Sequence, residues 1–85
     1  MAETQIQATE AHYQLLVDIN AGKVYDQYVE GFGEIPYLDV PGESPANVRQ
    51  LVWDLETLGW VSRPADDPHW RLTDAGRQAM EGSGL

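Results

Sequence analysis

One stretch, residues 44–76, constrains the fold more than any other part of the chain. Its sequence is SPANVRQLVWDLETLGWVSRPADDPHWRLTDAG. Apolar residues recur at helical spacing as far as Leu58, a glycine follows, and two short apolar segments then flank a turn rich in Asp and Pro. This order predicts a helix, a stop, a β-hairpin and the beginning of another helix.

The predicted helix of this stretch spans residues 45–58. Ser44 suits the N-cap position, and Pro45 suits the first helical position, where its missing N–H costs nothing. One side of the helix is apolar along its length, with Val48, Leu51, Val52, Leu55 and Leu58. Gly59 is expected to end the helix because glycine adopts the left-handed conformation readily.

The predicted hairpin has strands at residues 60–63 and 70–72. The turn between them contains Pro and Asp, which favour tight turns. Trp60 and Trp70 fall on opposite arms, so we expect them to form a cross-strand pair.

A first helix is expected from about Ala8 to Ala21, where apolar residues again recur at helical spacing. Either Thr4 or Thr9 could cap its start, and Gly22 should end it. His12 lies on the apolar side of this helix and is expected to be a hydrogen-bonded core or boundary residue.

Residues 23–29 are compatible with a strand or with a helical turn, because Val24, Tyr25, Tyr28 and Val29 fit both spacings. The following segment is rich in glycine and proline and cannot form a regular helix. We therefore expect a short strand at 23–29 that pairs with residues 35–40.

The chain should form a single domain, residues 1–85, because its length falls below that of a typical domain. Thr73 can cap a last helix that runs from Asp74 to about Met80. Residues 1–7 and 82–85 are expected to be frayed. The predicted fold class is α+β, with about three helices, a short antiparallel hairpin and an extra strand at 23–29.

Composition favours a folded chain outside the membrane. Apolar residues make up 42% and aromatic residues 9%, and there is no cysteine. No apolar run is long enough to span a bilayer, and the start lacks the apolar core of a signal peptide. We therefore expect a cytoplasmic protein without disulfides or thiolate metal sites.

The charge is strongly acidic. Fourteen acidic and five basic residues give a net charge of −9 and a pI of about 4.3. Residues 1–43 carry −7, whereas residues 44–77 carry only −1. Long-range attraction to phosphate is absent, so any contact with DNA is expected in the second half of the chain.

The segments LETLGWV and WRLTDAGRQAM resemble winged helix-turn-helix proteins of the MarR and PadR type, including small actinobacterial and phage winged-helix proteins. The similarity covers residues 44–81 well and residues 8–30 loosely. It implies a recognition helix at 45–58, a wing at 63–70 and a DNA-binding role, as in a transcriptional regulator or a phage accessory factor. By analogy, the first or last helix would supply a homodimer interface.

The resemblance implies that double-stranded DNA is contacted by Asn47, Arg49, Gln50, Arg63 and Arg71. The first three lie near the start of the predicted recognition helix, where Arg can pair with guanine and Asn or Gln with adenine. The two wing arginines could clamp phosphates. Equally, an arginine and a glutamine on the outer face of a helix are often only solvated surface.

The alternative function is an acidic protein-interaction module on the same fold, such as an adaptor or a DNA-mimic-like inhibitor. Trp53 motivates it, because helical geometry places this residue off the apolar stripe. The simpler interpretation is that Trp53 packs against residues 23–40. The sharper one is that it anchors a protein interface.

An enzyme is not expected, because the chain has no phosphate-binding glycine loop and no nucleophile elbow. Asp66, Asp67 and His69 could in principle hold a divalent ion, but a tight turn explains them more simply. No cofactor and no metal site are expected.

Overall fold

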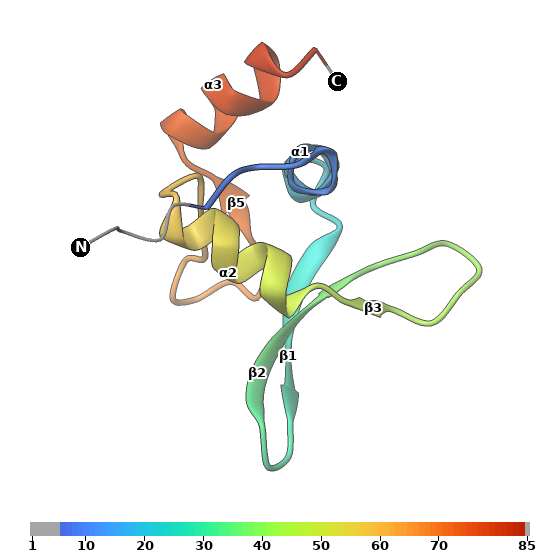
Figure 1. Ribbon diagram of the computed structural model, residues 1–85. Coiled ribbons are helices and arrows are strands. Elements are labelled where there is room, and N and C mark those ends of the chain that lie inside the picture. The colour runs from blue at the N-terminus through green and yellow to red at the C-terminus, as the bar shows by residue number, and fades with distance from the viewer. Residues whose placement is uncertain (1–5, 85) are drawn as a thin grey trace.

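The computed structural model describes residues 6–84 and has an α+β fold (Figure 1). Within these residues, three helices combine with a three-stranded and a two-stranded antiparallel sheet. In chain order the elements are α1 (Glu10–Asn20), β1 (Val24–Val29), β2 (Gly33–Leu38), β3 (Ala46–Asn47), α2 (Arg49–Thr57), β4 (Val61–Ser62), β5 (Arg71–Leu72) and α3 (Asp74–Gly82). The predicted fold class is confirmed. Thr4 and the other residues of 1–5, with residue 85, lie outside the described range.

The core lies where α1, α2 and the β4–β5 hairpin meet. Its buried side chains form one cluster: Leu15, Leu16, Ile19, Val24, Val48, Val52, Leu55, Val61 and Trp70. Five of them, Leu15, Leu16 and Ile19 of α1 with Val52 and Leu55 of α2, are positions that helical spacing turns to one side. The core therefore confirms the predicted stripes of both helices.

The β1–β2 hairpin extends away from the three helices (Figure 1). Its strands pair antiparallel, with Val24 opposite Leu38 and Val29 opposite Gly33, which confirms the strand predicted at 23–29. The outer edge of β1 is also bonded, since the Trp70 N–H donates to the Val24 carbonyl at 3.0 Å. A winged helix-turn-helix would carry a helix between α1 and α2, and this hairpin occupies that place.

The start of α2 differs from the prediction. The helix begins at Arg49, so the Ser44 cap and the Pro45 first position are wrong. The two residues of β3 pair with β2, and the Val48 N–H donates to a β2 carbonyl at 3.1 Å. Because sheet pairing holds this segment extended, the helix starts only after it. Gly59, with a φ of 78°, follows the end of α2 as predicted.

The outer helices begin at their threonine caps. Thr9 is the N-cap of α1, which therefore starts two residues later than predicted, at Glu10. Thr73 caps α3 as predicted, accepting a hydrogen bond from the Gly76 N–H at 3.1 Å. α3 extends to Gly82, two residues beyond the end predicted at about Met80.

The two hairpin tryptophans do not form the predicted cross-strand pair. Val61 of β4 lies opposite Leu72 of β5. The Trp60 ring packs against Tyr13 of α1, with 5.9 Å between ring centroids. Trp70 belongs to the core cluster, and its main chain is hydrogen-bonded to Val24 of β1. Each tryptophan therefore joins the hairpin to a different element.

No helix in the described part of the chain combines the length and apolar character needed to cross a membrane.

Candidate functional site

The residues predicted to contact DNA do not form one surface. Asn47, Arg49 and Gln50 lie together at the start of α2, where they line a hollow of about 490 Å³. Trp53, one turn further along α2, completes the lining. Arg63 and Arg71 lie in or beside the β4–β5 loop and do not reach this hollow. The structure thus brings the helix residues together and separates them from the two arginines.

Arg63 is occupied by contacts within the protein. Its Nε lies 2.8 Å from a carboxylate oxygen of Asp26, and its Nη2 lies 3.2 Å from Glu34. It also donates to the main-chain carbonyls of Pro64 and Asp67. An arginine with four acceptors, two in the β1–β2 hairpin and two in its own loop, is not available to clamp a phosphate.

Arg71 is paired as well, although it is exposed. Its Nη2 donates to Asp67 at 2.8 Å, and the other oxygen of Asp67 accepts the His69 N–H at 2.9 Å. These bonds, led by the one from the His69 main chain, hold the pKa of the Asp67 carboxyl well below its ordinary value. The acidic turn is therefore closed by its own hydrogen bonds, as a turn interpretation requires.

The two amides near the start of α2 also have partners. The Asn47 side-chain oxygen accepts the Arg49 N–H at 2.9 Å. The Gln50 amide donates to Asp54 at 3.1 Å. Arg49 differs from them, because its guanidinium has no hydrogen-bond or ion-pair partner within residues 6–84. Among the predicted DNA contacts, only Arg49 is a charged group free to meet a ligand.

A buried histidine anchors the other oxygen of Asp54. His12, which is 6% exposed, accepts the Thr9 N–H on Nδ1 at 2.9 Å, so its Nε2 carries the proton that it donates to Asp54, also at 2.9 Å. This bond, with that from Gln50, holds the pKa of the Asp54 carboxyl below its ordinary value. His12 is thus the hydrogen-bonded histidine that the sequence predicted, and it fixes α1 against α2.

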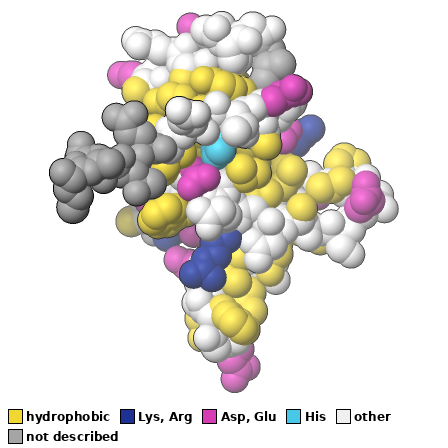
Figure 2. All heavy atoms as spheres, in the orientation of Figure 1, with side chains coloured by type: hydrophobic (Ala, Val, Ile, Leu, Met, Phe, Trp, Pro, Cys, Tyr) yellow, Lys and Arg dark blue, Asp and Glu magenta, His cyan; other side chains and the backbone are white. Residues whose placement is uncertain are grey.

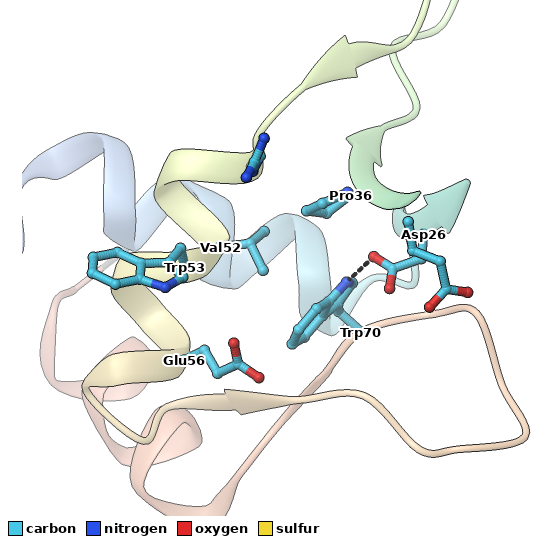
Figure 3. Close-up of a pocket in the computed structure, with 8 residues that line it drawn as sticks. Asp26, Pro36, Val52, Trp53, Glu56 and Trp70 are labelled. Atoms are coloured by element: carbon cyan, nitrogen blue, oxygen red, sulfur yellow. Dashed lines mark hydrogen bonds between the residues drawn. The ribbon is translucent and has the colours of Figure 1, made fainter. Parts of the chain in front are cut away.

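A second hollow, of about 170 Å³, lies between α2 and the β1–β2 hairpin (Figure 3). It shares Arg49 and Trp53 with the first hollow. The remaining lining residues come from β1, β2, α2 and the loop just before β5: Asp26, Glu34, Pro36, Val52, Glu56 and Trp70. The indole N–H of Trp70 donates to a carboxylate oxygen of Asp26 at 2.7 Å, drawn as a dashed line in Figure 3.

Trp53 marks the boundary between the two hollows. Trp53 is 58% exposed, so the prediction that it packs against residues 23–40 is wrong for most of the side chain. In Figure 3 its ring lies on the outer side of α2, and Glu56 lies between it and Trp70. A large exposed aromatic side chain beside a concave surface is typical of a binding site.

The hairpin adds a second exposed aromatic ring to the same side. Side chains alternate between the two faces of a strand, so Tyr28 shares a face with Asp26. Their partners on β2 are Glu34 and Pro36, two of the residues that line the smaller hollow. Tyr28 is 70% exposed. The face of the hairpin that borders the hollow therefore continues outward to an unburied aromatic side chain.

Sequence reasoning missed the hairpin contribution to this surface. The even-numbered residues of the predicted strand 23–29 include Asp26 and Tyr28, so the pattern already placed them on one face. It could not show that this face borders α2, because that depends on the pairing of β2 with β3.

Charge on this side is mixed. In the view of Figure 2, hydrophobic side chains extend along the projecting hairpin, with acidic groups at its tip and a Lys or Arg group at its base. Glu56 is exposed and has no hydrogen-bond or ion-pair partner in the described range. The surface is therefore not the continuous basic strip that nonspecific DNA binding requires.

The described residues contain no group of three or more His, Asp or Glu side chains placed to hold a metal ion. No protein-family model, curated protein or solved structure matches the chain.

Proposed function

We propose that the protein is an interaction module that binds a protein partner through the surface between α2 and the β1–β2 hairpin. The observation that carries this proposal is the exposure of Trp53 at the boundary of two adjoining hollows. Aromatic side chains in such positions supply much of the binding energy of protein interfaces. Exposed Tyr28 extends the same surface along the hairpin.

The charge distribution supports a protein partner over DNA. Two of the three arginines proposed for DNA contact are ion-paired within the chain. The net charge of −9 repels phosphate and favours a partner with a basic surface. On this surface the aromatic groups supply contact area, and the excess of acidic groups orients a basic partner and raises the rate of association.

The proposal is tested by differential capture. Tagged wild-type protein and two variants, Trp53→Ala and Phe32→Ala, are incubated with extract of the source cells, and bound proteins are quantified. Phe32 is the matched control, because it is 72% exposed but lies at the hairpin turn, outside both hollows. We expect one partner to be retained by wild type and Phe32→Ala and lost by Trp53→Ala. Equal capture by all three would contradict the proposal.

DNA binding is the second candidate, and one observation favours it. Asn47, Arg49 and Gln50 line a single hollow at the start of α2, where a recognition helix presents base-reading side chains. On this hypothesis Arg49→Ala weakens specific binding by about 1–3 kcal/mol, the range for a bidentate base contact. Unchanged affinity in a titration with a selected DNA site would remove Arg49 from the recognition set.

A further inference from the structure

We propose that the smaller hollow receives one Lys or Arg side chain of a basic protein partner, with Glu56 as its counter-ion and Trp53 and Trp70 as its aromatic walls. This inference rests on the proposed function, because it assigns the partner's chemistry at that same surface. It is carried by the shape, the aromatic content and the charge of the hollow.

The shape suits one extended side chain. The hollow has a volume of about 170 Å³, and its lining includes the buried apolar residues Val52 and Pro36. Lys and Arg side chains bury their aliphatic stems on apolar surfaces while the charged head stays at a polar rim. In Figure 3 the Glu56 side chain lies between the two tryptophans, where it can pair with that charged head.

The aromatic walls favour a cation. The face of a tryptophan ring carries partial negative charge and attracts an ammonium or guanidinium group. Trp70 is held in place by its hydrogen bond to Asp26, so its ring is ordered before a ligand arrives. Trp53 lines the hollow from α2 and is more than half exposed, so its ring is accessible to a bound side chain.

The carboxylates around the hollow leave a negative charge to be matched. Asp26 is satisfied, because it accepts from both Arg63 and Trp70. Glu34 shares the same arginine at 3.2 Å and is 55% exposed. Glu56 has no such partner in the described part of the chain. A bound cation would therefore neutralise Glu56 without displacing an existing ion pair.

Arg49 does not cancel this preference. It precedes Glu56 by seven residues on α2, which is about 10 Å along the helix axis. Arg49 also lines the hollow, so the bound cation is expected at the Glu56 end of it, two helical turns away from Arg49.

The test uses the whole ¹⁵N-labelled chain and a host peptide, acetyl-Gly-Ala-Xaa-Ala-Gly-amide, in which Xaa is arginine, citrulline or glutamate. Citrulline has the shape of arginine without its charge. The readout is the indole N–H signal of each tryptophan. Trp60 is the internal control, because it packs on Tyr13 and does not line the hollow.

We expect the arginine peptide to shift the Trp53 and Trp70 signals saturably while Trp60 stays in place. Citrulline should bind several-fold more weakly. Glu56→Gln should weaken arginine-peptide binding about two- to fivefold, the effect of an exposed ion pair. The matched control Glu81→Gln, on α3, should change nothing. Equal binding of citrulline, tighter binding of the glutamate peptide, or no shift at Trp70 would each overturn the inference.

The peptide titration and the capture experiment can fail independently of each other. If the peptides fail but Trp53→Ala still loses a captured protein, the surface binds a partner without a cation pocket. If the arginine peptide binds but all variants capture the same proteins, the pocket exists and the proposed function is wrong.

Discussion

Replacing Gly76 by alanine should separate α3 from the β4–β5 hairpin. A Cβ atom built at this position lies 1.9 Å from the Trp60 carbonyl oxygen and 2.8 Å from its carbon. Real Cβ contacts are not shorter than 3.0 Å, so the helix start must move by about 1 Å or more. Because the obstacle is main chain, no side-chain rotation can relieve it.

The expected loss is worked from the bonds that this movement stretches. Trp60 accepts the Thr73 N–H at 3.0 Å, and Thr73 in turn caps α3. Overpacking costs about 1–3 kcal/mol, and loss of the cap and of one hydrogen bond costs about 1 kcal/mol each. We therefore expect Gly76→Ala to lower the free energy of unfolding by about 3–5 kcal/mol, a large part of the total for a domain of this size.

The assay is urea denaturation followed by circular dichroism and tryptophan fluorescence. Gly82→Ala is the matched control, since it lies at the other end of the same helix and a Cβ there meets nothing within 4 Å. The control should be neutral or stabilising by up to about 1 kcal/mol. A Gly76→Ala variant within about 1 kcal/mol of wild type would refute the packing described for α3.

Three further predictions concern polar contacts and the exposed aromatic surface. Asp26→Ala should lower the free energy of unfolding by about 3 kcal/mol, because it leaves Arg63 without its buried partner; Arg71→Ala, an exposed pair, should cost less than about 1 kcal/mol in the same denaturation experiment. The pKa of Asp54 is lower in the folded protein than its ordinary value. The stability that this carboxylate contributes is therefore present above the ordinary Asp pKa and is lost as the pH falls through the folded value. Asp54→Asn should flatten the curve of unfolding free energy against pH below about pH 4. Trp53→Ala should change the melting temperature little, because most of the ring is exposed.

Each of these has a contradicting result. Equal losses in the two ion-pair variants would mean that the Asp26 contact is no more than a surface pair. Parallel pH curves for Asp54→Asn and wild type would remove Asp54 from the acid response. A large drop in melting temperature for Trp53→Ala would mean that this residue belongs to the core.

Local features made much of this fold predictable. Gly59 and Thr73 determine where α2 ends and where α3 begins whatever surrounds them, and both act as the sequence predicted. The strand at 23–29 was predictable because its β-branched and aromatic residues are followed by glycines and a proline that exclude a helix.

The remaining features depend on contacts between distant residues. Ser44 and Pro45 form a good helix start, yet α2 begins later because β3 pairs with β2. Arg63 was predicted to contact phosphate, but in the structure it pairs with Asp26, which is distant in the sequence. Trp53 was expected to pack against residues 23–40, yet more than half of it is exposed. The site is therefore less predictable than the fold, because it forms where these elements meet.

Whether the α2 surface binds a protein or DNA is tested most directly by titrating the protein with labelled genomic DNA fragments at low salt, followed by fluorescence anisotropy. Low salt favours any phosphate contact, so it gives DNA binding its best chance. If the α2 surface binds a protein partner, the anisotropy should show no saturable rise for wild type. Saturable DNA binding that disappears in Arg49→Ala would contradict the proposal of a protein partner and would indicate that α2 is a recognition helix.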